Sequence, residues 1–328
     1  MNKGWIYTDK INRQSGGAGQ TVLAYYTQRY THSDQAIWQT RIELGQILLD
    51  GQQTTPQTYL DYGQVLTYHR PPWQEPNVPL AFEVLYEDES LWAIAKPAGL
   101  PVLPGGGFLE HTLLHQMQQR YSHYQPVPVH RLGRGTSGVM LVAKSQSART
   151  VLSQQFRQRT RPMSTAVQPI LVKRYRALIG PTTPVELPDT FICNTPIGKY
   201  PYPKLGYVFA AAIDEGSGKP ARSVAQVLQR RSASTLLSIE IETGRPHQIR
   251  IHMAAKGYPL LGDPLYRAGG LPIATGEAIP SDCGYQLHAY QIQFQHPVSK
   301  KAIEITAPPP DLLQVRSPQR NLKLRFSN

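Results

Sequence analysis

The chain has 328 residues, of which 40% are hydrophobic, and it carries 34 Lys and Arg against 22 Asp and Glu, a formal net charge of +12. This hydrophobic fraction is ordinary for a folded globular protein and excludes wholesale disorder, and no apolar run approaches the roughly 20 residues that a membrane helix needs. The length suits one good-sized core plus a small additional domain. The polar N-terminus, MNKGWIYTDK, lacks the apolar stretch of a secretory signal, so we expect a cytoplasmic protein with no membrane association.

The excess of basic residues favours a polyanionic partner, because binding to phosphates releases condensed counterions. Charge alone does not distinguish RNA from DNA or from an acidic lipid surface, and a merely soluble basic protein is the simpler alternative. Three groups concentrate the positive charge: Arg157, Arg159 and Arg161; Lys173, Arg174 and Arg176; and Arg316, Arg320, Lys323 and Arg325.

The two cysteines, Cys193 and Cys283, are too few for a disulfide framework or a cysteine-based metal cluster. Their number is typical of a reducing compartment. We expect both to be small buried filler.

The N-terminal part of the chain shows little periodic apolarity up to about residue 30 and contains the run Gly16-Gly17-Ala18-Gly19. We therefore expect residues 1–30 to be a flexible lead-in. From Ser33 the pattern becomes compact. Ser33 can cap a helix that continues to Leu44, and Gly45 is placed to end it.

A small domain is predicted over residues 31–70. The strand at 47–49 is followed by Asp50-Gly51, a strong tight-turn signal, and a second strand covers 65–68. The segment WQTRIELGQILLDGQQTTPQTYLDYGQVLTYHRP resembles the αL RNA-binding domain first known from a ribosomal small-subunit protein. The alternative is a small α+β adaptor domain without a ligand.

The prolines of residues 71–80 predict a stiff linker, since proline fixes its own φ and discourages helix before it. The larger domain is predicted over 81–310, and the basic residues 311–328 form a tail that either binds RNA or is a frayed end. We expect an α+β fold with a mainly antiparallel sheet. Its strands are predicted at 91–95, 139–143, 175–179 and 236–242, and its helices at 111–121 and 148–158.

The segment PVHRLGRGTSGVMLVAKS, residues 128–145, places a loop rich in glycine, arginine and hydroxyl residues directly before a buried strand. Such a loop at the mouth of a strand suits close approach of the backbone to an anionic ligand. An ordinary tight turn is the alternative for a glycine-rich loop taken alone.

A second segment, IEIETGRPHQIRIHMAAKGYPLLGDPLY, predicts a strand ending at Glu242, a turn at 243–245, and a helix whose first turn contains Pro246. Arg245 would lie at this junction beside free backbone N–H groups, a geometry that favours an anion such as phosphate. His247 and His252 are five positions apart and do not share one helix face. We expect them to be hydrogen-bonding scaffold, and we expect no metal site.

In order and surroundings, these segments resemble the RluA family of pseudouridine synthases from about Val84 to Pro297. HRLGRGTSG is similar to the family motif H-R-L-D-x-x-T-S-G, and KRYRALIG is similar to the strand that bears the family's active-site tyrosine. TGRPHQIRIH with PLLGDPLY is close to the family consensus. YEDESLWAIAKPAGLPVLPG, TPIGKYP, GKPARS and LHAYQIQFQHP follow the same family order.

The resemblance implies an enzyme that swings a uridine out of RNA, breaks its glycosidic bond, rotates the uracil and rejoins it through carbon, without a cofactor. Ribosomal or transfer RNA would be the partner, and no obligate protein partner is evident. Tyr175 would stack on the uracil and take its carbon proton, and Arg245 would engage a phosphate or an active-site carboxylate; the simpler alternatives are a strand aromatic and a structural salt bridge. Residues implied to bind the RNA are His130, Arg131, Arg134, Thr136, Ser137, His247, Gln248 and Arg250.

The motif departs from the family at Gly133, which occupies the place of the catalytic aspartate. That aspartate attacks the sugar or removes a sugar proton, and glycine can do neither. Three accounts are open: another carboxylate, such as Glu242, Asp263 or one from the N-terminal region, substitutes for it; a subset of the family works by a modified route; or the protein binds RNA without isomerising it. Metal-dependent nucleic-acid hydrolysis is a poor alternative, because no ligand cluster has suitable spacing.

Overall fold

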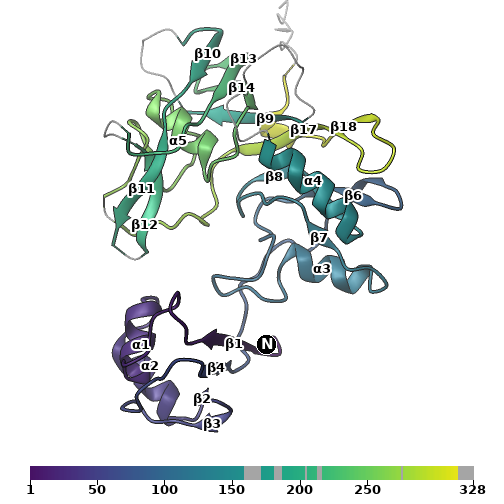
Figure 1. The fold of residues 1–328 in the computed structure, drawn as a ribbon. Helices are drawn as coiled ribbons and strands as arrows, with labels where there is room; N and C mark the ends of the chain where they lie inside the picture. Colours follow the sequence, from purple (N-terminus) through teal and green to yellow (C-terminus); the bar gives the residue numbers. More distant parts are fainter. Residues whose placement is uncertain (159–170, 181–186, 204, 213–215, 275, 317–328) are drawn as a thin grey trace, which may run out of the picture. The chain divides into compact units, whose positions relative to one another are not determined.

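The structure is a computed structural model that describes residues 1–158, 171–180, 187–203, 205–212, 216–274 and 276–316 (Figure 1). The chain divides into two compact units. The N-terminal unit comprises residues 1–77 with 105–110 and 201–207, and the larger unit comprises the rest.

The N-terminal unit is a four-stranded antiparallel sheet with a pair of helices. The strand order is β1 (Trp5–Lys10), β4 (Val65–Arg70), β2 (Ile47–Leu49) and β3 (Gln52–Gln53). Helices α1 (Val22–Arg29) and α2 (Gln35–Glu43) contact each other. The core of this unit is made by Ile11, Val22, Tyr25, Tyr26, Trp38, Ile42, Ile47, Leu60, Leu66 and Tyr68.

The expectation of a flexible lead-in over residues 1–30 was wrong. β1 pairs with β4 over six residues, and the Thr21 hydroxyl caps α1 by accepting the Ala24 N–H at 3.2 Å. Tyr25 and Tyr26 are each 2% exposed in the core. The small domain therefore begins at the N-terminus, because its aromatic core needs residues from α1. The glycine run at residues 16–19 favours a flexible segment, so the sequence did not predict α1 directly after it.

The predicted helix at 33–44 exists as α2, but its cap is Asp34, whose carboxylate accepts the Ile37 N–H at 2.8 Å. The turn at Asp50-Gly51 is confirmed, with φ of 49° and 79° in the left-handed region. The linker is shorter than expected, because residues 71–77 belong to the N-terminal unit. Glu75 is 4% exposed and accepts the backbone N–H groups of Leu109 and Glu110.

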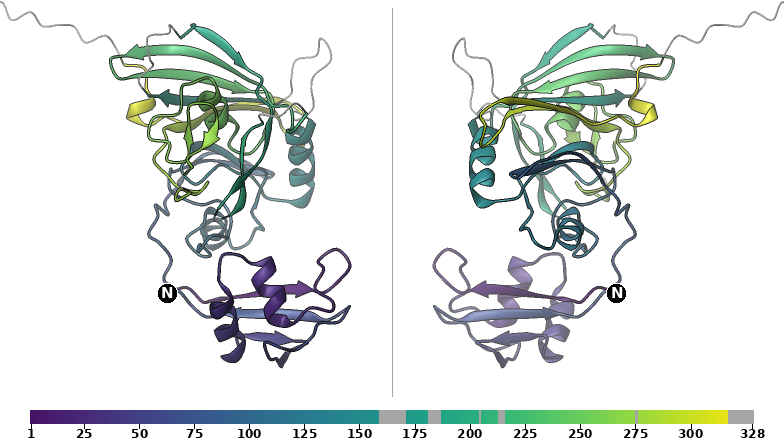
Figure 2. Two further views of the ribbon diagram at one scale, coloured as in Figure 1. Left: turned by 90° about the vertical axis from the view of Figure 1, so that its left-hand side faces the viewer. Right: turned by 90° about the vertical axis from the view of Figure 1, so that its right-hand side faces the viewer.

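The larger unit is built on a ten-stranded sheet, and it confirms the predicted α+β class (Figure 2). The main order is β10 (Thr190–Cys193), β13 (Ser223–Arg231), β14 (Ser234–Ile241), β9 (Val172–Ile179), β17 (Leu287–Gln295), β8 (Ser137–Ala143), β6 (Leu91–Lys96) and β5 (Glu83–Glu87). β18 (Ala302–Thr306) pairs with β17, and β7 (Val127–Pro128) pairs with β8. The pairs are antiparallel except β17 with β8, which is parallel at the centre of the sheet.

Two hydrophobic cores support this sheet. One packs α3 (Leu113–Arg120) and α4 (Gln146–Gln158) against β6 and β8, and the other packs α5 (Gln248–Ala255) against β9 and β14. Every residue of β8 is buried, which explains its continuous apolar run. Two short hairpins complete the unit: β11 (Ile197–Tyr202) with β12 (Gly206–Ala211), and β15 (Tyr266–Arg267) with β16 (Leu271–Pro272).

Gly138 is required where β8 meets β17. Its φ is +110°, and a Cβ atom there would lie 2.2 Å from the Ala289 carbonyl oxygen. A side chain would separate the two strands. This glycine holds the parallel contact that brings the loop before β8 beside the start of β17.

The predicted tail begins later than residue 311. Asp311–Leu313 form a 3-10 helix, and Leu313 is 1% exposed against Leu178 and Leu236. Arg231 donates to the carbonyls of Leu312 and Gln314. Arg320, Lys323 and Arg325 of the tail lie outside the described residues, as do Arg159 and Arg161.

Candidate active site

The loop before β8 opens on a pocket of about 110 Å³ in the larger unit. Tyr175 of β9 and the start of β17 form another part of its wall, and the segment from the end of β14 into α5 forms the rest. The lining residues are Arg131, Leu132, Gly133, Thr136, Tyr175, Ile241, Arg245, His247, Gln248, Ile249, Arg250, Tyr285 and Leu287. Residues from four separate stretches of sequence thus meet at one end of the central strands.

Most of the predicted site residues line this pocket, but His130, Arg134 and Ser137 do not. His130 accepts the Leu141 backbone N–H at 3.1 Å and stacks on Phe156, and burial lowers its pKa to about 3. The Ser137 hydroxyl bonds His288 Nδ1 at 2.8 Å in the interior. The His130 and Ser137 side chains therefore face the interior of the larger unit and support the loop without lining the pocket.

Lys96 positions the glycine-rich loop. Its ammonium is 1% exposed and donates to three carbonyl oxygens: Pro97 at 2.8 Å, Leu100 at 2.8 Å and Arg134 at 3.2 Å. The Gly99 N–H also bonds the Arg134 carbonyl, at 2.8 Å. The lysine-proline turn after β6 therefore holds the backbone of the loop next to Gly133.

Arg250 is not open to solvent. Its guanidinium donates twice to Asp263, at 2.7 Å each, and the two side chains are 3% and 1% exposed. The guanidinium lies over the Tyr285 ring at 4.1 Å and the Tyr266 ring at 5.0 Å. A planar bidentate pair of this kind is strong and directional, so it locks α5 to the segment that carries Asp263.

The turn before α5 differs from the prediction. His247 has φ +54°, so α5 begins at Gln248 and Pro246 lies before the helix. The Arg245 N–H is not free, because it donates to Gln248 Oε1 at 3.1 Å. Gln248 is 3% exposed and also bonds Thr243 and Ser223, so its amide organises this turn.

His247 is held in one tautomer. The Tyr266 hydroxyl donates to the Phe209 carbonyl at 2.6 Å, so it must accept from His247 Nδ1, 2.8 Å away. Burial lowers the pKa of His247 to about 4. The imidazole is therefore neutral at physiological pH, with its proton on Nδ1 and a lone pair on Nε2.

Tyr285 occupies the space next to Gly133. A Cβ atom on Gly133 would lie 2.8 Å from the Tyr285 hydroxyl oxygen, and the same oxygen is 3.3 Å from Thr136 Oγ1. Tyr285 is 4% exposed, and burial raises its pKa, so the phenol stays protonated. Tyr285 was not among the predicted site residues, because no local sequence signal connects it with a glycine 152 positions earlier.

None of the described residues that line the pocket is an aspartate or glutamate. The carboxylates considered as substitutes are engaged elsewhere: Glu242 pairs with Arg222, and Asp263 pairs with Arg250. Arg131 and Arg245 lie in the wall, and the charge of Arg250 is balanced by Asp263, so the pocket lining has a net positive charge.

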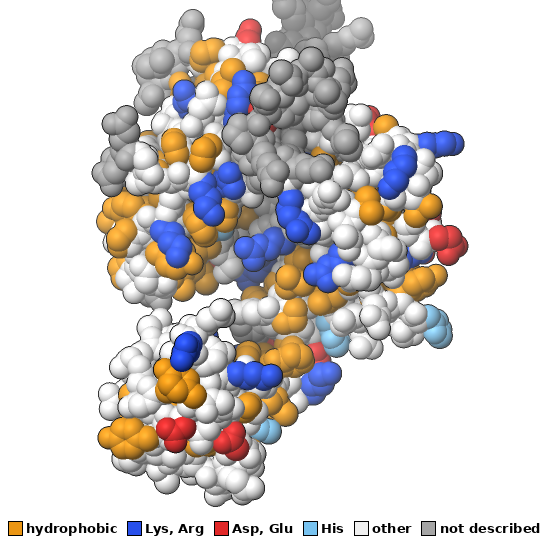
Figure 3. Space-filling model, in the orientation of Figure 1, with side chains coloured by type: hydrophobic (Ala, Val, Ile, Leu, Met, Phe, Trp, Pro, Cys, Tyr) orange, Lys and Arg blue, Asp and Glu red, His pale blue; other side chains and the backbone are white. Residues whose placement is uncertain are grey.

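Two arginines of the second basic group form contacts within the protein. Arg174 bonds Gln291 and pairs with Glu240, and Arg176 donates to the Leu313 carbonyl. Lys and Arg side chains lie at several places on the face of the larger unit shown in Figure 3. Cys193 is buried as expected, but Cys283 is exposed, because it lies in a surface turn before β17.

The described residues also bear on metals and membranes. No group of three or more His, Cys, Asp or Glu side chains among them is arranged to hold a metal ion. Within the same part of the chain, no helix is long and apolar enough to cross a bilayer.

The fold and the pocket together place a tyrosine ring and guanidinium groups at one end of a mainly antiparallel sheet. The family model for RNA pseudouridylate synthase matches residues 90–255, about half of the chain. The chain belongs to this family, whose members isomerise uridine in RNA to pseudouridine, and it is an RNA pseudouridine synthase.

Several relatives resemble nearly the whole chain. An RNA pseudouridine synthase of Synechocystis sp. is 51% identical over 293 residues, which cover 89% of this chain and 95% of that protein. RNA pseudouridine synthase 5 of Arabidopsis thaliana is 39% identical over 96% of this chain and 95% of its own. In the solved structure of human RNA pseudouridylate synthase domain containing 1, the same fold is found with a TM-score of 0.54 and 20% identity, covering 74% of this chain and 89% of that one.

Proposed function

We propose that this chain isomerises uridines of ribosomal or transfer RNA in the cytoplasm, and that the pocket at Gly133 receives the extruded uridine. The pocket supports this most directly, because it joins an aromatic ring, Tyr175, to the guanidiniums of Arg131 and Arg245. A ring that stacks on a base and cations that neutralise phosphate are what an extruded nucleotide requires. Ribosomal large subunit pseudouridine synthase D of Neisseria meningitidis, 32% identical over 96% of this chain and 82% of its own length, supports a ribosomal substrate.

Tyr175 stacks on the uracil in this proposal, and Arg131 and Arg245 bind the phosphates beside the target. Burial raises the pKa of Tyr175 to about 12, so its hydroxyl is protonated in the free protein. The side chain therefore provides a stacking ring and a hydrogen-bond donor up to the step in which uracil loses its C5 proton.

The route without a carboxylate uses groups that are present. The His247 Nε2 lone pair takes the proton from C2′ of the sugar. The C–H electron pair forms a C1′=C2′ double bond, and N1 of uracil leaves with the electron pair of the glycosidic bond. His247 then returns that proton to C2′ as C1′ bonds to uracil C5, and the C5 proton is released to water, from which N1 takes up a proton. With a pKa of about 4, His247 is about as basic as an ordinary aspartate, near 3.9. The protonated Tyr285 hydroxyl and the nearby guanidiniums stabilise the negative charge on the departing uracil.

The first experiment deletes the gene and maps pseudouridines in total RNA by carbodiimide labelling, with rescue by the natural protein and by Tyr175→Phe. One or a few uridines should lose the modification and regain it with the natural protein, and the map then names the substrate. An unchanged map, with the protein expressed and the RNA pool covered, would contradict the proposal. Gly133 would then favour the alternative, a protein that binds RNA without isomerising it.

A further inference from the structure

The N-terminal unit contains a second pocket, of about 350 Å³, that is lined mainly by aromatic rings. β1 contributes Tyr7, α1 and its end contribute Tyr26 and Tyr30, α2 contributes Trp38 and Arg41, and β4 contributes Tyr68 and Arg70. Asp9, His32, Gly106 and Gly107 complete the lining. Every one of these residues belongs to the N-terminal unit, so the pocket is a property of that unit alone.

The rings form a connected wall. The Tyr7 and Tyr68 rings are stacked, with centroids 5.9 Å apart and planes inclined by 18°. Trp38 meets Tyr68 edge-on at 5.5 Å and lies 4.8 Å from Tyr26. Trp38, Tyr26 and Tyr68 are buried and belong to the core. Tyr7 is 43% exposed, so its ring forms an accessible edge of the wall.

The charges in this pocket select against a cationic ligand. The Arg41 guanidinium lies 4.4 Å over the Trp38 ring and 5.3 Å over the Tyr68 ring. Arg70 lies 3.6 Å over Trp73, whose indole N–H bonds the Gly107 carbonyl at 2.7 Å. An aromatic cage binds a methylated amine through the ring faces, and a guanidinium already over these rings repels such a cation.

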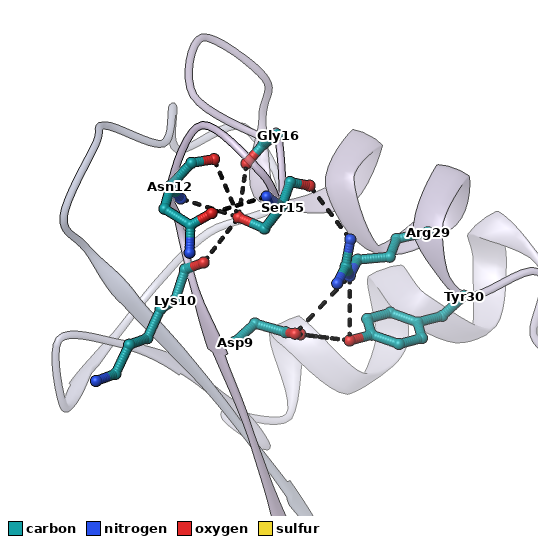
Figure 4. A network of polar contacts seen from close by, with 7 residues as sticks. All are labelled: Asp9, Lys10, Asn12, Ser15, Gly16, Arg29 and Tyr30. Carbon is teal, nitrogen blue, oxygen red and sulfur yellow. Dashed lines mark hydrogen bonds and ion pairs between the residues drawn. The ribbon is translucent and has the colours of Figure 1, made fainter. Parts of the chain in front are cut away.

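Asp9, the single acid of the lining, is already engaged (Figure 4). It accepts the Tyr30 hydroxyl at 2.6 and 2.8 Å from its two oxygens, and Arg29 lies 3.8 Å away. These contacts hold the end of α1 against β1. Burial, together with the charges of Arg41 and Arg70, lowers the pKa of His32, so this ring is neutral at physiological pH. The pocket therefore offers neutral rings and guanidiniums.

We propose that this pocket holds one unpaired base of the RNA substrate by stacking, with Arg41 and Arg70 on the adjacent phosphates. The volume suits a single base, every base has a face that can stack, and the guanidiniums match the phosphates that flank it. This inference rests on the proposed function, and it assigns the N-terminal unit a contact outside the uridine pocket. The unit thereby favours RNA with an unpaired nucleotide over continuous duplex.

The test compares the natural protein with Tyr7→Ala and Arg41→Gln, using Tyr62→Ala as the matched control. Tyr62 is an exposed tyrosine of the same unit that does not line the pocket. Because Tyr7 is 43% exposed and does not belong to the core of this unit, we expect its removal to leave the core intact, and circular dichroism with thermal unfolding verifies this for each variant. The probes are a single-stranded RNA of about twelve nucleotides, within the range that one binding domain covers, and a blunt duplex of the same sequence.

We expect Tyr7→Ala to bind the single strand about ten- to a hundredfold more weakly, the loss that one base stack gives. Arg41→Gln should also bind it more weakly, because a phosphate contact is lost. Tyr62→Ala should bind like the natural protein, and Tyr7→Ala should leave duplex binding unchanged. Equal affinity of Tyr7→Ala and Tyr62→Ala for the single strand would overturn the proposal. The assay requires no turnover, so this result is independent of whether the pseudouridine map depends on the gene.

Discussion

At the scale of single residues, the effect of Gly133 depends on Tyr285, whose side chain lies next to it. The Tyr285 hydroxyl oxygen is the only atom of that side chain within 4 Å of the place where a Cβ on Gly133 would be. The tyrosine thus fills the space that an aspartate side chain needs. A simple replacement of Gly133 by aspartate is therefore not a return to the family's usual site.

We predict that Gly133→Asp is destabilising alone and better tolerated in a Tyr285→Phe background, because loss of the oxygen removes the close contact. The coupling should be about 0.5–3 kcal/mol, as found for residues in contact. Urea unfolding of the two single variants and the double variant measures it. Additive effects would show that Tyr285 does not occupy the aspartate's space.

The activity of the same double variant shows whether the natural chain is inactive or works without the carboxylate. A gain from no activity to clear activity would indicate that the natural chain is inactive. Activity in the natural chain, unchanged or lowered in the double variant, supports a route that does not need the carboxylate.

His247 is the proposed base of the reaction, so its replacement tests the mechanism. We predict that His247→Gln lowers kcat by about 10²–10⁴, the range of general acid–base catalysis. The control is His123→Gln, at an exposed position outside the pocket. In the natural protein the basic form of His247 persists down to about pH 4, so kcat should show no titration near pH 6.5 from this group. Full activity of His247→Gln would remove it from the mechanism.

At the scale of elements, α5 is held by buried polar contacts as well as by its apolar face. His252 is fully buried, with Nδ1 2.9 Å from the Ser223 hydroxyl and Nε2 3.0 Å from the Thr195 carbonyl. The carbonyl requires a proton on Nε2, and Ser223 donates to Nδ1. Both contacts thus fit the neutral imidazole, and burial lowers its pKa to about 4.

We predict that acid destabilises the protein through this helix. The folded pKa lies below the unfolded value near 6.5, so unfolding takes up a proton. The stabilisation is complete above about pH 6.5 and declines as pH falls towards 4, by up to about 1.4 kcal/mol per pH unit for one histidine. Urea unfolding between pH 6.5 and 5 should show a shallower decline for His252→Gln, which keeps the Thr195 contact. An unchanged slope would contradict the assignment, and His123→Gln supplies the control.

At the scale of the whole molecule, the net charge of +12 favours binding to the phosphates of RNA. We predict that affinity for RNA falls steeply between low and moderate salt, because each neutralised phosphate releases counterions. The dissociation constant measured against salt concentration gives the number of contacts from its slope. Affinity that is indifferent to salt would count against binding through the arginine groups.

Some arginines form contacts within the protein, and these contacts reduce the expected dependence of RNA affinity on salt concentration. Arg174, Arg176 and Arg231 bond other parts of the larger unit, so they contribute less than their number suggests. The sequence pointed to Arg174 and Arg176 but not to their partners, since Glu240 lies on the neighbouring strand β14 and Leu313 is far away in the chain.

The sequence by itself determined the features that depend on local order: the family motifs, the buried strand β8, the helix α2 and the tight turn at Asp50-Gly51. These depend on periodicity, turn chemistry and motif spacing, which are properties of short segments. The tertiary structure alone decided that residues 1–30 complete an aromatic core, that Asp263 pairs with Arg250, and that Tyr285 stands beside Gly133. Each of these is a contact between side chains distant in sequence or a packing requirement of the whole unit, and only the folded backbone brings such groups within bonding distance.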